Sequence, residues 1–193
     1  TSRDFARKFK KPNIDDKYFV VNMLIRVLLL SLTLLISTKA FAQLDTVRAI
    51  KKVHSDASKM VEAFLLEEYD SFLTYVHPLI IQQSGGSGKL KRSFRAGIAP
   101  NASIVSSVVE PPKKIIFLDS TWQCAFVNHQ LMNMSGNEYT ITGYIIGISY
   151  NEGGKWHFLS VSGNSLKFMQ NIVPEISSEL QVSRQTKPKL VKY

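Results

Sequence analysis

The chain has 193 residues, of which 45% are hydrophobic and 20% charged, a balance that suits about one globular domain. It has 24 lysines and arginines against 15 aspartates and glutamates, but residues 1–42 hold 8 of the basic and 3 of the acidic residues, so residues 43–193 carry a net charge of only +4. This small excess removes most of the support for a nucleic-acid-binding protein, and the single cysteine, Cys124, excludes an intramolecular disulfide and a cysteine-based zinc site.

The chain begins with a polar stretch that leads into an apolar one. Residues 1–22 are rich in lysine, arginine and aspartate, lack apolar periodicity and precede Met23, the first methionine. We expect them to be a non-native or disordered leader, produced by translation from too early a start. The alternative is a long basic region in front of a signal peptide.

Residues 23–42 have the three parts of a secretory signal peptide. A short basic start precedes an apolar run over residues 27–36, and the segment ends with small residues at Ala40 and Ala42, as a signal peptidase requires. We predict cleavage before Gln43 and export to the periplasm or the medium. The apolar run is too short to span a bilayer of roughly 30 Å, the alternative being a retained anchor. Glutamine in place of cysteine at position 43 excludes a lipoprotein.

Helical periodicity begins close behind the predicted cleavage site. Apolar residues there recur every three or four positions, which predicts a helix with one buried face, and Asp45 is its expected N-cap. A second helix, with Asp70 as its expected N-cap, ends at His77-Pro78 because proline disfavours a helical conformation in the preceding residue. A glycine-rich turn separates the last two helices of this half. The four expected helices cover residues 46–68, 69–76, 79–83 and 89–95.

From Asn101 onward the apolar period changes to two, which predicts strands. Ser135-Gly136-Asn137 indicates a hairpin between two long strands, and Pro174 stops a last short helix. Because helices come first and antiparallel strands follow, the sequence predicts an α+β fold with N-terminal helices packed on one face of a curved antiparallel sheet. The expected strands cover residues 104–109, 114–118, 122–134, 138–150 and 156–161, and the last helix covers 165–172.

Three motifs add a resemblance to this order of elements. They are Tyr69-Asp70-Ser71-Phe72, His77-Pro78 followed by Gly85-Gly86, and the run Ile-Ser-Tyr-Asn-Glu-Gly-Gly-Lys-Trp-His-Phe at 148–158. The arrangement resembles the cone-shaped NTF2-like fold, and more narrowly a group of small secreted bacterial proteins of unassigned function. The resemblance covers residues 45–180. We therefore expect one domain over residues 43–180 and a basic, irregular tail over 181–193.

The resemblance implies a fold and leaves the function open, because NTF2-like proteins include isomerases and dehydratases as well as members with only a ligand pocket or partner surface. An active cone needs a proton shuttle and an oxyanion stabiliser that face one cavity. If the strand faces that carry His129 and Tyr144 coincide and look into the cone, these two residues are the candidate acid/base pair. We interpret His54 as a helix-flank residue, His77 as a partly exposed turn residue and Cys124 as a buried apolar one.

We expect no metal and no cofactor. The four histidines are scattered, without the His-x-x-x-His or Glu-x-x-His spacing that places two ligands on one helical face. The segment Gly85-Gly86-Ser87-Gly88-Lys89 lacks the spacing of a phosphate-binding loop and follows a helix, whereas such a loop follows a strand. The sequence also has no Gly-x-Ser-x-Gly nucleophile motif.

Three functions are compatible with these observations. The leading hypothesis is an exported, non-enzymatic binding module whose apolar pocket or sheet face takes a small molecule, a glycan fragment or a protein partner. One alternative is a cone-pocket enzyme of the isomerase, lyase or hydrolase type. The other is an envelope structural protein that acts as a homodimer. None of the three involves nucleic acid, or a membrane span once the signal peptide is removed.

Overall fold

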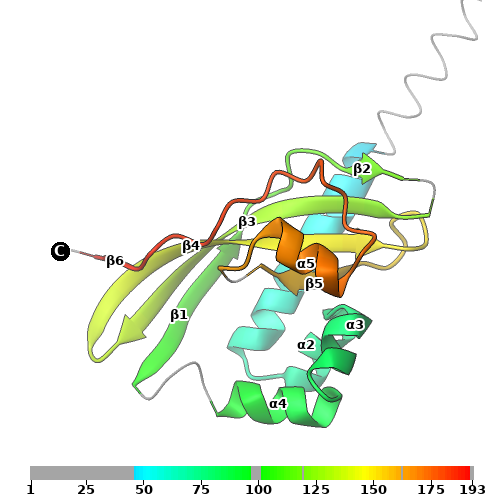
Figure 1. Cartoon of the computed structure of the whole chain (residues 1–193). Helices are drawn as coiled ribbons and strands as arrows, with labels where there is room; N and C mark the ends of the chain where they lie inside the picture. The colour runs from blue at the N-terminus through cyan, green and yellow to red at the C-terminus, as the bar shows by residue number, and fades with distance from the viewer. Residues whose placement is uncertain (1–45, 97–100, 119, 162, 192–193) are drawn as a thin grey trace, which may run out of the picture. The chain divides into compact units, whose positions relative to one another are not determined.

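The computed structural model describes residues 46–96, 101–118, 120–161 and 163–191, in which helices precede an antiparallel sheet (Figure 1). The expected leader, the signal peptide with Ala40, Ala42 and Gln43, and the expected cap Asp45 lie outside the described residues. Within them, no helix is both long enough and apolar enough to cross a bilayer.

Five helices are described, and their bounds lie close to those that the sequence predicts. The first covers residues 46–65, three residues short of the prediction, because the chain turns at Glu67, whose φ is 58°. His77 caps α3 through its ring, and Pro78 occupies the first helical position, where its missing N–H costs nothing. The other helices are α2 (Tyr69–Tyr75), α3 (Pro78–Gln83), α4 (Ser87–Arg95) and α5 (Leu166–Ile172).

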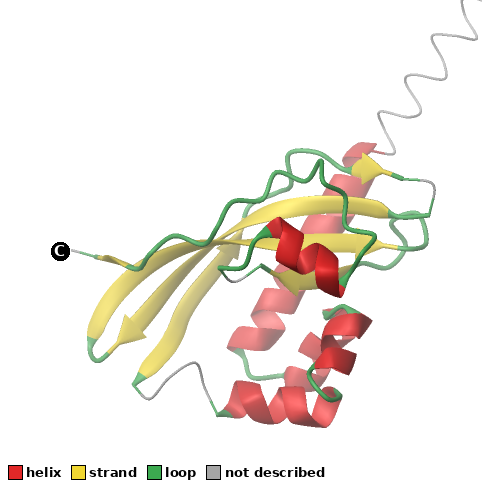
Figure 2. Cartoon of the chain, viewed as in Figure 1, coloured by secondary structure: helices red, strands yellow, loops and turns green. Residues whose placement is uncertain are grey.

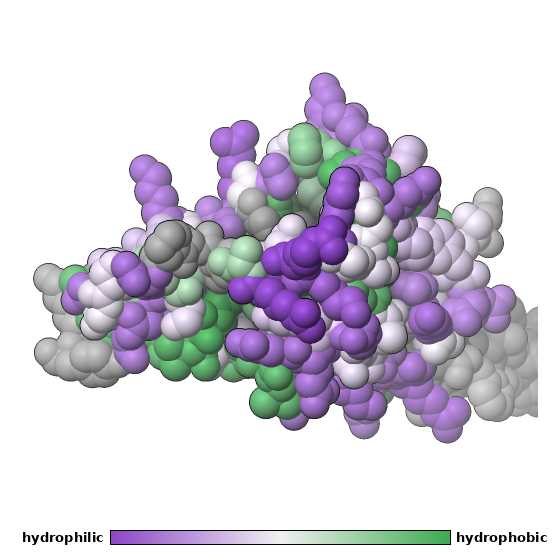
Figure 3. All heavy atoms as spheres, turned by 90° about the horizontal axis from the view of Figure 1, so that it is seen from below, coloured by the Kyte–Doolittle hydropathy of each residue, from purple (hydrophilic) through white to green (hydrophobic). Residues whose placement is uncertain are grey.

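The prediction that Asp70 caps α2 is wrong. The N-cap position belongs to Glu68, whose side chain makes no capping hydrogen bond. The left-handed turn at Glu67 starts the helix early enough to place Asp70 inside the first turn. There its carboxylate forms an ion pair with Lys91 of α4. Figure 3 views the molecule from the side of α4 and shows a largely hydrophilic surface there.

The six described strands form one curled antiparallel sheet of order β1-β3-β4-β5, with β2 added beside β3 and β6 beside β4 (Figures 1 and 2). A tight turn at Ser135-Gly136, both with positive φ, joins the two long central strands and sets their register from Met134↔Asn137 to Trp122↔Ser149. The α+β class is therefore confirmed. The strands are β1 (Ala102–Val109), β2 (Ile116–Phe117), β3 (Trp122–Met134), β4 (Asn137–Ser149), β5 (His157–Ser160) and β6 (Lys189–Leu190).

The two faces of the sheet are covered by different segments. On one face, Phe126 and Phe158 pack against the first helix through Val53 and Ala57, all at most 1% exposed. Trp156 joins this layer, and Cys124 is fully buried in it, where burial raises the pKa of its thiol. The interior between the first helix and the sheet is thus filled by large apolar side chains, and Cys124 is the buried residue that the sequence indicates.

The opposite face carries α5 and the chain that follows it. Ile146 and Ile148 of β4 point to this side and pack with Met169 of α5 and with Val173, the C-cap residue of that helix. The sequence prediction placed the N-terminal helices on one face and gave no position for the last helix, which the structure shows on the other face. Strand alternation shows that a second apolar face exists on β4, but it does not say which element covers that face.

The C-terminal strap, defined here as residues 175–191, continues across this second face (Figure 1). Ile176 and Leu180 are buried in the same core cluster as α5. Further on, the Thr186 N–H donates to the Thr142 carbonyl over 2.8 Å, and β6 pairs with β4. The expected irregular tail is therefore partly a strand. β5 pairs only with residues 145–148 of β4. The strap forms hydrogen bonds with the earlier part of the same edge, whose backbone groups would otherwise lack a partner.

Candidate functional site

A small groove lies on the second face of the sheet, between the strap and the segment that follows β1. Its volume is about 190 Å³. The floor comes from β3 and β4, one wall from residues 110–114 and the other from the strap. The lining residues are Glu110, Pro111, Lys113, Lys114, Ala125, Val127, Tyr144, Leu180, Gln181 and Ser183.

The floor of the groove follows from strand register. Ala125 and Val127 are two residues apart on β3 and share a face, and Tyr144 stands directly opposite Val127 on β4. All three side chains are partly exposed, although the same face is fully covered nearby at Ile146. The groove is therefore a place where the apolar face of the sheet reaches solvent.

The wall formed by residues 110–114 is rigid and positively charged. The Glu110 N–H donates to the Val127 carbonyl over 2.9 Å, which fixes the wall to the floor, and the prolines at 111 and 112 restrict the backbone beyond it. Lys113 and Lys114 follow, both exposed and both lining the groove. Within the described part of the chain, neither lysine has an ion-pair partner.

The candidate pair His129 and Tyr144 shares this face of the sheet, as the prediction required. His129 stands opposite Thr142, two pairs along from Val127↔Tyr144 and therefore on the same face. Its Nε2 lies 2.8 Å from Oε1 of Glu110, and its Nδ1 lies 3.1 Å from the Thr142 hydroxyl. However, His129 is about half exposed and does not line the groove. The face that carries the two residues is the one opposite the first helix, and Glu110, the contact of His129, also lines the groove beside Tyr144.

A second polar cluster was not anticipated from the sequence. The His77 Nε2 lies 2.7 Å from the Tyr150 hydroxyl, which donates to the Glu175 carboxylate. Since the His77 Nδ1 accepts the Leu79 N–H over 3.3 Å, the proton of a neutral ring is on Nε2, which donates to Tyr150. The interpretation of His77 as partly exposed is wrong, because this residue is only 2% exposed. Its partners lie 73 and 98 residues further along the chain, and no local signal connects them.

The environment of this cluster favours neutral side chains. Burial lowers the pKa of His77, an effect opposed by the nearby Glu175 carboxylate. Burial also raises the pKa of Tyr150, and its hydrogen bond to Glu175 acts in the same direction. The His157 ring lies 6.2 Å from that of His77, and its pKa is lowered by burial and by Lys155. The hydrogen bonds of His77 and Tyr150, whose shifted pKa values both favour the neutral side chain, connect the start of α3, the end of β4 and the start of the strap.

We predict that stability falls as pH is lowered below about 6.5, because of His77 and His157. Unfolded histidines bind protons near that pH, whereas the folded ones resist protonation, so the unfolded state takes up protons that the native state does not. The slope is at most about 1.4 kcal/mol per pH unit for each histidine. Urea unfolding at pH 7.5, 6.5 and 5.5 measures it.

His77→Asn provides the comparison for this prediction, because asparagine keeps an N-cap acceptor without a titratable group. The variant is less stable at pH 7.5 but loses less further stability on acidification than the unmodified protein. Identical slopes for the two proteins would contradict the assignment of the pH dependence to His77.

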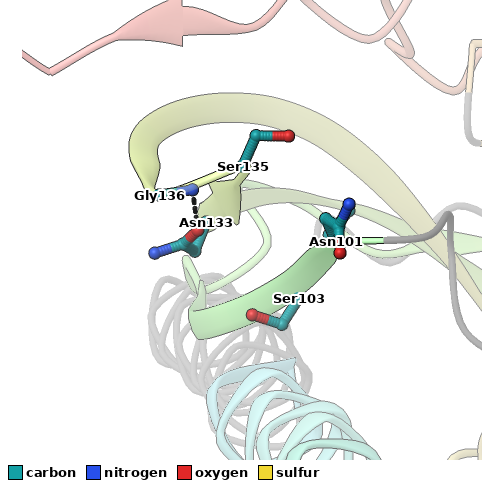
Figure 4. A pocket seen from close by; sticks show the side chains of 6 residues that line it. Asn101, Ser103, Asn133, Ser135 and Gly136 are labelled. Carbon is teal, nitrogen blue, oxygen red and sulfur yellow. Dashed lines mark hydrogen bonds between the residues drawn. The ribbon is translucent and has the colours of Figure 1, made fainter.

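Another hollow lies at the tip of the β3–β4 hairpin, beside the start of β1. Its volume is about 480 Å³, and small polar side chains dominate its lining (Figure 4). The Asn133 side chain accepts the Gly136 N–H over 3.0 Å and so closes the turn. No titratable side chain lines this hollow, so it offers no acid/base chemistry. Its lining residues are Asn101, Ala102, Ser103, Asn133, Ser135 and Gly136.

Among the described residues, no three metal-ligating side chains of histidine, cysteine, aspartate or glutamate come together. Comparison with known proteins does not assign the chain to a family, since no family model, no curated protein and no solved structure matches it. The groove and its lysines are consequently the starting point for a functional assignment.

Proposed function

We propose that this chain is an exported, non-enzymatic binding module of NTF2-like architecture, and that the groove beneath the strap takes a small molecule. Helices followed by a curled antiparallel sheet support the architecture, and the features of residues 23–42 support export. The observation that carries the binding role is the partly exposed apolar floor at Val127 and Tyr144, enclosed by two walls from distant parts of the chain.

The packing on the other face of the sheet argues against a cone-pocket enzyme. Such an enzyme needs space between the first helix and the sheet for a substrate. Phe126, Phe158 and Trp156 occupy that region, and none is more than 1% exposed. In the polar cluster of His77, Tyr150 and Glu175, the side chains form hydrogen bonds that connect three segments of the chain. The binding role therefore fits the arrangement of side chains better than catalysis.

Native mass spectrometry of the full-length gene product, purified from the compartment to which it is exported, tests the binding role. The expected spectrum contains the protein with a small non-covalent mass bound. Val127→Trp fills the groove and is expected to abolish that added mass. Val105→Trp is the matched control, because Val105 is 51% exposed on β1 and does not line the groove.

Three results would overturn the proposal. The first is a bare monomer mass for the unmodified protein. The second is an added mass that survives Val127→Trp in a correctly folded variant, which would place the ligand elsewhere. A doubled mass without ligand would also contradict it and would favour the dimeric structural role.

A further inference from the structure

The charges around the groove are unbalanced in favour of cations. Lys113 and Lys114 line it without ion-pair partners among the described residues. The one carboxylate in the lining, that of Glu110, is engaged by His129 at 2.8 Å. Exposed lysines beside a low-dielectric wall create a local positive potential, which concentrates anions at the site.

The later part of the strap adds cations. Residues 181–191 contain Arg184, Lys187 and Lys189 and no acidic residue, whereas Glu175 and Glu179 lie in the part before them. The strap is held along the edge of β4 by the contacts of Thr186 with Thr142 and by β6. Arg184 directly follows Ser183, which lines the groove, so at least this cation belongs to the segment that forms the wall.

The size and lining of the groove restrict the body of a ligand. About 190 Å³ corresponds to roughly six water molecules at about 30 Å³ each. This volume is smaller than the roughly 300–1,000 Å³ of pockets for drug-sized ligands. The floor offers the Val127 side chain and the Tyr144 ring, which suit a flat or short apolar group. A single ring or a short alkyl chain fits these limits.

We propose that the groove binds a small organic anion, with one acidic head group on a short apolar body. Lys113 and Lys114 bind the head group, and Val127 and Tyr144 contact the body. This inference rests on the proposed binding function and adds the chemical class of its ligand. Lysine suits the role because its ammonium acts as a mobile point charge with three donors, which does not require one fixed head-group geometry.

Hexanoate and hexan-1-ol are suitable probes, because they share an alkyl chain and differ in the charge of the head group. Titration of the full chain with each, followed by two-dimensional NMR, gives apparent dissociation constants and locates the perturbed residues. We expect hexanoate to perturb Val127 and Tyr144 and to bind more tightly than hexan-1-ol. Raising the salt concentration is expected to weaken only hexanoate, because salt screens the lysines.

The variant K113Q/K114Q removes both proposed head-group contacts and is expected to weaken hexanoate on the order of tenfold. Its effect on hexan-1-ol should be negligible. K51Q/K59Q is the control, because it makes the same change in net charge on the first helix, at two exposed positions on the other side of the sheet. This control is expected to bind hexanoate as the unmodified protein does.

The outcomes separate the two proposals. Equal affinity for both probes, unchanged in K113Q/K114Q but lost in Val127→Trp, would overturn the anionic ligand and leave the binding module intact. Equal weakening of hexanoate by K113Q/K114Q and K51Q/K59Q would overturn the specific role of the two groove lysines. If neither probe perturbs Val127 or Tyr144 at millimolar concentration, both the ligand class and the groove as a binding site are overturned.

Discussion

Truncation of Phe126 to alanine is expected to lower the free energy of unfolding by about 3–5 kcal/mol. The Phe126 side chain is fully buried, and its ring packs against that of Phe158 with 5.9 Å between their centroids. Its neighbours come from the first helix and the sheet, so no single element can move to fill the space. Since domains of this size are stable by about 5–15 kcal/mol, the loss is a large share of the total. Urea unfolding measures this loss as a lower midpoint concentration, provided that the m-value is the same in both proteins.

Phe117→Ala is the matched control, with the same chemical change at a residue that is 48% exposed on β2. Its ring contacts Trp122 edge-to-face at 4.8 Å, so a loss of about 1 kcal/mol is expected. Similar losses for both variants would show that the space between the first helix and the sheet is not the main core. The cone-pocket enzyme would then regain support, because that space would be open to a substrate.

Local sequence patterns predict most of the elements of the fold. The apolar period of the first helix, the hairpin signal at Ser135-Gly136 and the proline at 78 each act over a few residues, and the corresponding elements lie within a few residues of their predicted positions. Errors occur where the outcome depends on distant contacts. The strap is an example, because residues 189–190 form a strand only where β4 offers an unoccupied edge.

The same distinction applies to the candidate site. Alternation along β3 and β4 places His129 and Tyr144 on one face, and the tight hairpin fixes their relative positions. The walls of the groove come from residues 110–114 and 180–183, which have no periodic pattern and are brought together only by the folded sheet. The hydrogen bond between His77 and Tyr150 joins residues 73 positions apart. Contacts between residues so far apart in the chain depend on tertiary structure, and no local sequence pattern predicts them.

Replacement of Gln123 by leucine is expected to cost about 2–5 kcal/mol and to loosen the start of the strap. Gln123 is fully buried, and its amide donates to the Glu175 carbonyl over 2.7 Å and accepts the Ser177 N–H over 2.8 Å. It also donates to the Thr121 hydroxyl over 2.9 Å. Leucine has a similar volume, so little cavity forms, but two partly buried backbone groups lose their partner, at about 1–3 kcal/mol each.

Hydrogen exchange distinguishes this mechanism from general destabilisation. In Gln123→Leu, the amide of Ser177 and those of the strap that pair with β4 are expected to exchange faster by a larger factor than the amides of the β3–β4 hairpin. Gln83→Leu, at an exposed position on α3, controls for the added leucine. Equal acceleration in the strap and the hairpin would mean that Gln123 stabilises the whole sheet and does not anchor the strap. Selective opening of the strap should also weaken hexanoate, because one wall of the groove moves with it.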